Sequence, residues 1–129
     1  MRKFFILAIA AMMTVLTLAG CAVQVKTYTD SGQTIDMGVK KEFIIALGSN
    51  PTTGYMWQES FDTTYLELVE QLYKPSKPAQ GGTVGGGGVE YFWFKALKAG
   101  KTEITLVYKR PGEETKPEDV TRVFTINIQ

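Results

Sequence analysis

The stretch that decides the fold is TEITLVYK, residues 102–109. Its larger side chains recur at every second position, whereas polar side chains occupy most of the positions between them. Successive side chains of a β-strand point to opposite faces of a sheet, so a period of two predicts a strand with one buried face. The residues expected on the buried face are Thr102, Ile104, Leu106 and Tyr108.

Similar segments, rich in β-branched and aromatic residues, occur on both sides of this strand. Turn residues such as Asp30-Ser31-Gly32 separate them, and no segment keeps the 3.6-residue period of an amphipathic helix. We therefore expect an all-β domain, an immunoglobulin-like antiparallel β-sandwich of about seven to eight strands. The further strands expected cover residues 22–29, 42–47, 55–61, 65–73, 89–97 and 119–128.

The segment 89–97 contains four consecutive aromatic residues, YFWF at 91–94. Both faces of this strand therefore carry large apolar surface, which predicts a central position in its sheet. Each large side chain that is fully buried contributes roughly 1.5–3 kcal/mol. The other residues expected in the core are Phe43, Ile45, Trp57, Leu106 and Phe124.

The first 20 residues are typical of a signal peptide. Arg2 and Lys3 form a charged start, and an apolar run follows from Phe4 to Leu18. A membrane-spanning helix needs about 20 predominantly apolar residues, so this run is short for a span. We expect cleavage, which leaves a single domain at 21–129 with 12 basic and 13 acidic residues.

The signal segment ends in Leu18-Ala19-Gly20-Cys21, and Cys21 is the only cysteine of the sequence. This ending resembles the bacterial lipobox, in which the cysteine is acylated and becomes the first residue after cleavage. Acyl chains contribute about 0.8 kcal/mol per buried methylene, so several chains on Cys21 would give stable anchoring. We expect an exported protein, lipid-anchored to the bacterial cell envelope on the periplasmic face or the cell surface.

Residue usage excludes several kinds of active site. The sequence has no histidine, and its one cysteine is assigned to the anchor, so Ser-His-Asp, Cys-His and histidine or thiolate metal sites cannot form. No enzyme activity, metal or cofactor is expected. Lysine and arginine form no stripe along the sequence, so neither nucleic acid nor electrostatic binding of anionic lipid is expected. The expected partner is another protein.

Four acidic residues near prolines are the remaining candidates for chemistry. We interpret them as a solvated loop, because one loop does not hold two carboxyls on opposite sides of a sugar cleft, and no calcium-loop spacing is present. A carboxylate enzyme is accordingly the least favoured function. The four residues are Glu113, Glu114, Glu118 and Asp119.

The segment NPTTGYMW at 50–57 predicts a rigid, projecting turn. Pro51 restricts φ, Gly54 permits positive φ, and Asn50 can hydrogen-bond to nearby backbone. Thr52 and Thr53 would stand at the tip, where small side chains fit a narrow cleft and lose little entropy on binding.

This segment resembles the signature loop of the chagasin-like cysteine protease inhibitors. Gly85-Gly86-Gly87-Gly88 is similar to the family's glycine-rich loop, and Arg110-Pro111 is similar to its Arg-Pro loop. The order, spacing and strand context of the three motifs agree over about residues 25 to 129. Three motifs in this order are specific, whereas any one alone would be weak.

The resemblance implies a reversible, competitive inhibitor that inserts three loops into the active-site cleft of papain-like proteases. Thr52 would lie over the catalytic cysteine, and Gly85 to Gly88 would run along the cleft. Arg110 and Pro111 would contact its leaving-group side. The protease-binding residues implied are Asn50, Pro51, Thr52, Thr53, Gly54, Tyr55, Gly85, Gly86, Gly87, Gly88, Arg110 and Pro111. A monomer suits such a wedge.

One position departs from the family. An aromatic residue commonly follows Arg-Pro, and this sequence has Gly112. The third loop therefore lacks a large anchor of the kind that often dominates binding.

The alternative function is an immunoglobulin-like envelope or adhesion lipoprotein that binds another protein through a sheet face. The inhibitor predicts that Thr52, Gly87 and Arg110 converge at one end, whereas the alternative predicts an exposed apolar face.

Overall fold

The computed structural model describes residues 24–76 and 86–129. The expected signal peptide, Cys21 and Gly85 lie outside these residues. The described part forms eight strands and one short 3₁₀ helix, and it contains no helix long and apolar enough to cross a membrane. The elements are β1 Lys26–Tyr28, β2 Thr34–Met37, β3 Glu42–Ser49, η1 Pro51–Thr53, β4 Met56–Phe61, β5 Leu66–Pro75, β6 Gly88–Ala96, β7 Gly100–Lys109 and β8 Val120–Ile128.

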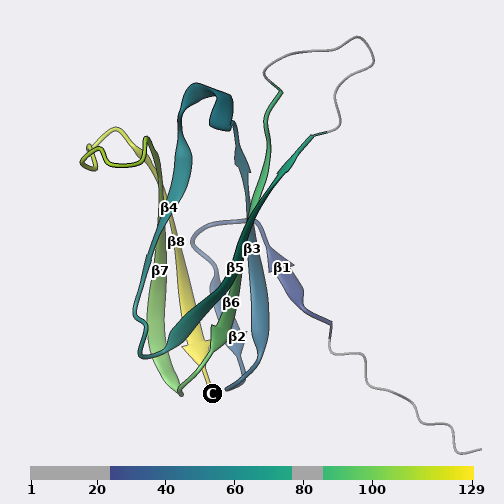
Figure 1. The fold of residues 1–129 in the computed structure, drawn as a ribbon. Helices are drawn as coiled ribbons and strands as arrows, with labels where there is room; N and C mark the ends of the chain where they lie inside the picture. Colours follow the sequence, from purple (N-terminus) through teal and green to yellow (C-terminus); the bar gives the residue numbers. More distant parts are fainter. Residues whose placement is uncertain (1–23, 77–85) are drawn as a thin grey trace, which may run out of the picture.

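The strands form two four-stranded sheets that pack face to face (Figure 1). One sheet has the order β1-β3-β6-β5 and the other has the order β2-β8-β7-β4. The expected immunoglobulin-like sandwich is confirmed. The aromatic strand β6 lies between β3 and β5, so its expected central position is also confirmed.

The sheets are mixed rather than purely antiparallel, because two edge strands pair in parallel. Tyr28 of β1 lies opposite Ile45 of β3, and Ile35 of β2 lies opposite Ile126 of β8. Of the expected first strand at 22–29, residues 22 and 23 lie outside the described part and residues 26–28 form β1, whereas β2 was not expected at all. The partners of these short strands are remote in sequence, so local alternation gave no indication of either pairing.

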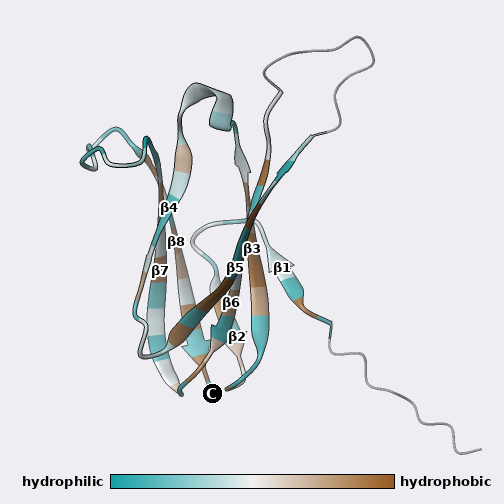
Figure 2. Ribbon diagram, in the orientation of Figure 1, coloured by the Kyte–Doolittle hydropathy of each residue, from teal (hydrophilic) through white to brown (hydrophobic). Residues whose placement is uncertain are grey.

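The core lies between the two sheets, where hydrophobic residues alternate with polar ones along the strands (Figure 2). All five core residues expected outside the aromatic strand are 5% exposed or less, so their assignment is confirmed. Phe92 and Phe94 of β6 are fully buried, while Tyr91 and Trp93 lie half-buried on the outer face. The aromatic run is therefore divided between core and surface by the strand period.

The two ends of the sandwich carry different connections. The loop end carries residues 50–55, the inner ends of the glycine-rich connection at 76 and 86–88, and residues 110–119 (Figure 1). The opposite end, here called the base, carries the turns at 38–41, 62–65 and 97–99. Strand β3, eight residues long, runs from the base to the loop end.

Candidate functional site

The first loop, residues 50–55, is a single 3₁₀ turn. The N–H of Thr53 donates to the carbonyl of Asn50 at 3.2 Å, and the N–H of Gly54 donates to the carbonyl of Pro51 at 2.9 Å. Gly54 has φ of 82°, a left-handed conformation that favours glycine. Thr52, Thr53 and Gly54 are exposed. The predicted rigid, projecting turn is therefore what the chain forms.

Side chains within the first loop hold its shape. The hydroxyl of Thr53 donates to the carbonyl of Asn50 at 2.7 Å, and the hydroxyl of Thr52 donates to the amide oxygen of Asn50. Both threonine hydroxyls are thus engaged inside the turn, which leaves their methyl groups and the backbone as outward surface. Such local side-chain to backbone bonds are typical of Asn, Ser and Thr in turns.

Two aromatic side chains, one on β4 and one on β7, connect the first loop to the sandwich. The indole N–H of Trp57 donates to the carbonyl of Gly48 at 2.8 Å, so it links the strands on the two sides of the loop. The hydroxyl of Tyr108 accepts the N–H of Asn50 at 2.9 Å. The Trp57 and Tyr108 rings lie 5.0 Å apart. The loop therefore rests on a packed aromatic support.

A buried carboxyl group, missed from the sequence, completes this support. Glu90 is 1% exposed, and its Oε2 accepts the backbone N–H of Trp57 at 3.0 Å, which joins β6 of one sheet to β4 of the other. Its Oε1 and the hydroxyl of Ser49 are buried without a hydrogen-bond partner among the described residues. Glu90 alternates with Phe92 and Phe94, and that period of two was the signal that places it inside.

The environment of Glu90 disfavours its charge. Burial raises the pKa of its carboxyl above the ordinary value of 4.5, the N–H of Trp57 acts in the opposite direction, and the charge of Glu59 raises the pKa further. Removal from water is the largest of these effects. An ionised Glu90 therefore costs stability, although its hydrogen bond to Trp57 supports the loop.

The glycine-rich segment lies beside the first loop. A Cβ added to Gly87 would lie 3.0 Å from the carbonyl oxygen of Ser49 and 3.6 Å from Cβ of Asn50. A Cβ on Gly88 would overlap the backbone of β5 at Lys74, whereas one on Gly86 would meet nothing within 4 Å. Packing inside the molecule therefore requires glycine at position 88 and leaves little room for a side chain at position 87. Gly86 has open surroundings, and Gly85 lies outside the described residues.

The third loop, residues 110–119, begins with a tight turn. The N–H of Glu113 donates to the carbonyl of Arg110 at 3.3 Å, and Gly112 has φ of 83°. A proline followed by a residue with positive φ is typical of a type II turn. Gly112 supplies that conformation without steric cost.

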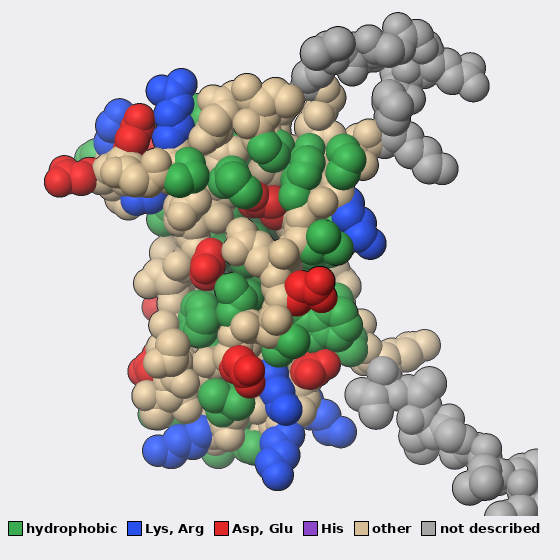
Figure 3. All heavy atoms as spheres, viewed as in Figure 1, with side chains coloured by type: hydrophobic (Ala, Val, Ile, Leu, Met, Phe, Trp, Pro, Cys, Tyr) green, Lys and Arg blue, Asp and Glu red, His purple; other side chains and the backbone are tan. Residues whose placement is uncertain are grey.

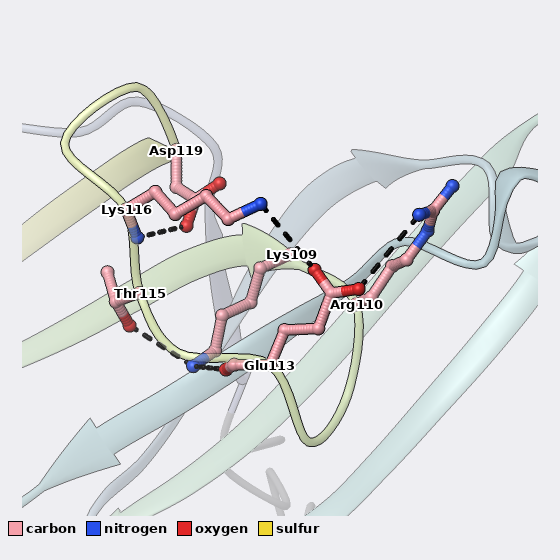
Figure 4. Close-up of polar contacts among 6 residues, drawn as sticks. All are labelled: Lys109, Arg110, Glu113, Thr115, Lys116 and Asp119. Atoms are coloured by element: carbon pink, nitrogen blue, oxygen red, sulfur yellow. Dashed lines mark hydrogen bonds and ion pairs between the residues drawn. The ribbon is translucent and has the colours of Figure 1, made fainter.

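Polar contacts hold the rest of the third loop (Figure 4). The Lys109 ammonium donates to the carbonyl of Glu113 at 2.8 Å, and the Lys116 N–H donates to the Asp119 carboxylate at 2.7 Å. The Glu113 carboxylate lies 3.9 Å from Arg110 and 4.0 Å from Lys116. These charged side chains are about half exposed. The expected solvated character of this acidic loop agrees with these exposures.

The three loops form one continuous surface. Gly87 of the second loop packs against Asn50 of the first. On the other side of the first loop, the Arg110 guanidinium lies 5.2 Å from the centre of the Tyr55 ring, and a Cβ on Gly54 would lie 3.6 Å from Arg110 Nε. The first loop is therefore central, with the second and third loops on its two flanks.

Other candidate sites within the described ranges are open surface grooves without a metal-binding group. No group of three His, Cys, Asp or Glu residues in residues 24–76 and 86–129 could hold a metal ion. The outer face of the β1-β3-β6-β5 sheet carries a shallow groove of about 170 Å³. It is lined by Ile44, Glu70, Leu72, Lys74, Tyr91 and Trp93. A second groove, of about 650 Å³, lies beside Trp57, Tyr91 and Arg122. The loops thus converge as the inhibitor requires, whereas these two grooves are the surfaces on which the alternative would depend.

Comparison with known proteins agrees with this geometry. The family model described as Chagasin family peptidase inhibitor I42 matches residues 36–128. Amoebiasin-2 of Entamoeba histolytica is 29% identical over 129 residues, which are 100% of both chains. Chagasin of Trypanosoma cruzi is 28% identical over 109 residues, which cover 80% of this chain and 94% of that protein.

A solved structure shares the fold. The crystal structure of a cysteine protease inhibitor from Entamoeba histolytica has a TM-score of 0.69 to this chain at 26% identity, covering 82% of this chain and 98% of the other. The family match spans well over half of the sequence and includes all three loops. It also makes the protein an inhibitor rather than an enzyme. The chain belongs to the chagasin family of peptidase inhibitors.

Proposed function

We propose that the protein inhibits papain-like cysteine proteases reversibly and competitively, by inserting its three loops into the active-site cleft. The observation that carries this proposal is the continuous surface in which Gly87 packs on Asn50 and Arg110 packs on Tyr55. Three loops so joined act as one wedge. A surface that is already ordered loses less entropy on binding than a flexible peptide substrate does.

The first loop would enter the cleft most deeply, with Thr52 over the catalytic cysteine. Thr52 is exposed at the tip, and its hydroxyl is held by Asn50, so a compact and rigid group would face the nucleophile. A 3₁₀ turn is not the extended backbone of a substrate. Because no carbonyl is offered at attack distance and angle, the loop would be bound without being cleaved.

The flanking loops would contact the two sides of the cleft. Gly85 to Gly88 would run along the cleft and pair through backbone groups, a mode that exposed glycines such as Gly86 favour. Arg110 and Pro111 would contact the leaving-group side. The half-buried Tyr55 ring beneath Arg110 would supply aromatic surface there, next to the position where Gly112 offers none.

We also propose that the protein acts outside the cytoplasm as a lipid-anchored monomer. The support is the sequence itself: a charged start, a short apolar run and the Leu-Ala-Gly-Cys ending at Cys21. Mass spectrometry of the protein purified from a bacterial membrane fraction tests this proposal. Acyl chains on Cys21 as the first residue would support it, whereas an unmodified or uncleaved amino terminus would contradict it.

Inhibition is tested by titrating papain and a cathepsin L-type protease with a chain that begins at Ala22. All eight strands and the core lie beyond residue 24, so this chain keeps them. Residual hydrolysis of a small peptide substrate is measured at several substrate concentrations. We expect the apparent affinity to weaken as substrate rises, which is the mark of competition.

The matched variants are Thr52→Trp at the loop end and Thr63→Trp at the base. Both threonines are exposed in turns, so both variants should fold. We expect Thr52→Trp to weaken inhibition by at least about a hundredfold, the equivalent of losing a hot-spot contact, and Thr63→Trp to leave it unchanged. Equal effects of the two variants would exclude the first loop as the binding element.

A further inference from the structure

The base of the sandwich carries a compact surface that inhibition does not use. The N–H of Lys40 donates to the carbonyl of Ala96 at 2.7 Å, and the N–H of Ala96 donates to the carbonyl of Lys41 at 2.9 Å. These bonds hold the turn at 38–41 against the turn at 97–99. The surface so formed is called the basal patch, and its residues are Val39, Lys40, Lys41, Leu97 and Lys98.

The basal patch combines aliphatic side chains with positive charge. Val39 is 37% exposed and Leu97 is 40% exposed, and the three lysines around them are exposed as well. Lysine and arginine side chains gather along the lower rim of the molecule in Figure 3. Exposed aliphatic groups rimmed by charge are typical of interaction sites.

Carboxyls on the neighbouring elements partly offset this charge. Asp62 lies in the turn at 62–65, and Asp36, Glu42 and Glu67 lie within strands near the base. Glu42 accepts the indole N–H of Trp93 at 3.1 Å, and Asp62 accepts the N–H of Thr64 at 2.9 Å. The patch lysines lie in the turns beyond the strand ends, so the outermost surface of these two turns carries lysine and no carboxyl.

The backbone conformation of Lys40 does not favour a lysine side chain. Lys40 has φ of 67°, and it is the non-glycine residue with positive φ among those described. Glycine would adopt this conformation at no steric cost, whereas a side chain at this φ is strained. A lysine at this tip is therefore locally unfavourable, and binding through its charge would offset that cost.

The first described strand begins at the same end, five residues after the expected lipid anchor. Lys26, the first residue of β1, lies in register with Phe43, two residues beyond Lys41. Cys21 precedes Lys26 by five residues, which can span at most about 17 Å. The loop end lies eight strand residues away from the base, a distance of about 26 Å. An acylated Cys21 would therefore bring the base, and not the loops, to the membrane.

We propose that the basal patch rests on the anionic phospholipid surface that holds the acylated Cys21, with Val39 and Leu97 at the interface and the lysines on the headgroups. The inhibitory loops then point away from the membrane, towards proteases in solution. The membrane orientation rests on the proposed anchoring at Cys21 and is independent of inhibition. Lysine near an anionic surface strengthens binding by about fivefold per residue. This proposal departs from the expectation, drawn from the lack of a basic stripe in the sequence, that anionic lipid is not bound electrostatically, because the fold brings lysines of separate turns together.

The test measures co-sedimentation of the chain that begins at Ala22 with vesicles, so that the patch is assayed without acyl chains. Vesicles of phosphatidylcholine with phosphatidylglycerol are compared with phosphatidylcholine alone at low and physiological ionic strength. We expect binding to the anionic vesicles only, weakening as salt rises. Equal binding to both kinds of vesicle, or no binding to either at low salt, overturns the proposal.

The variants separate a charged contact from a folding defect. Lys40→Gly removes a charge and relieves the strained φ, so we expect the fold to be kept and vesicle binding to fall about fivefold. Lys116→Gln, at the loop end, removes the same charge and should leave binding unchanged. If both variants lose binding equally, net charge alone acts and the patch does not. Inhibition of a soluble protease without lipid should be the same for Lys40→Gly and wild type, so a failure of inhibition is read separately from a failure of vesicle binding.

Discussion

The first and third loops reach the same surface but are stabilised by different interactions. Residues 50–55 rest on buried and half-buried side chains. The Tyr108 hydroxyl accepts the N–H of Asn50, and below the loop the Trp57 indole donates to Gly48 and Glu90 accepts the N–H of Trp57. Residues 110–119 are held by hydrogen bonds of exposed side chains and by ion pairs of 3.9 and 4.0 Å. Exposed pairs contribute about 0–1 kcal/mol, whereas losing the partner of a buried polar group costs about 1–3 kcal/mol. The central loop is thus held by contacts to buried side chains and the flanking loop by polar contacts of exposed side chains.

The largest expected effect comes from removing the aromatic support. Trp57→Ala deletes a side chain that is 5% exposed, together with its hydrogen bond to Gly48. We expect a loss of about 3–5 kcal/mol in the free energy of unfolding and a loss of inhibition. Urea denaturation measures the first and protease titration the second. Trp93→Ala, on the half-buried outer face, should cost less and should leave inhibition intact.

A smaller effect is expected at Glu90. Glu90→Ala leaves the buried N–H of Trp57 without its acceptor, so we expect a loss of about 1–3 kcal/mol. Glu90→Gln keeps an oxygen at this place and cannot ionise. At neutral pH it should be at least as stable as wild type, because the buried carboxylate charge is unfavourable.

The pH dependence of the Gln variant sharpens this prediction. A carboxyl whose folded pKa is raised above 4.5 favours folding most when it is protonated, below 4.5, and this contribution is lost as pH rises through the folded pKa. The stability advantage of Glu90→Gln over wild type should therefore grow from pH 4 towards neutral pH. Thermal unfolding of both proteins across this range measures it. A constant difference would mean that Glu90 has an unshifted pKa.

The hydroxyl of Tyr108 is one contact between the first loop and the strands below it, and its removal tests that contact. Tyr108→Phe keeps the ring that packs on Trp57 but removes the acceptor of the Asn50 N–H. We expect a loss of about 1 kcal/mol in stability. Hydrogen exchange at the Asn50 amide should accelerate more than exchange within β7 itself. Uniform acceleration would indicate global destabilisation instead of a loosened loop.

The smallest effect is expected in the third loop. Glu113→Gln removes both ion pairs, yet the side chains of Arg110, Glu113 and Lys116 are about half exposed. We expect a change in stability of less than about 1 kcal/mol, which added salt should reduce further. Chemical denaturation at low and high salt measures this. A loss as large as that of Glu90→Ala would mean that the two loops do not differ in the way described above.

The backbone of the third loop explains why glycine stands at position 112. A type II turn needs positive φ at this position, and Gly112 has 83°. The aromatic that commonly follows Arg-Pro in the family would be strained in this backbone. Tyr55, packed against Tyr108 at 5.6 Å and beneath Arg110, brings aromatic surface to the same flank from the first loop.

Much of the molecule could be predicted because its signals are local. The alternation around Ile104 and Leu106 predicted a half-buried strand, and the aromatic run at 91–94 predicted a central one, since side-chain direction in a strand depends only on residue order. The three loop motifs predicted a site through their resemblance to the chagasin family, and the assignment of their residues to protease contacts stays a prediction. Glu90 was missed because its acidic side chain outweighed the period of two that places it beside Phe92.

Local sequence patterns indicated every described strand except β2, together with the core and the three loop motifs, because alternation and turn chemistry act over a few neighbouring residues. Only the tertiary structure decided that β1 and β2 pair in parallel, that Arg110 lies over Tyr55, and that Gly88 is required by the backbone of β5. It alone also gathered lysines from separate turns at the base. The physical reason is that these contacts join residues far apart in the chain, and only packing of the two sheets brings them together.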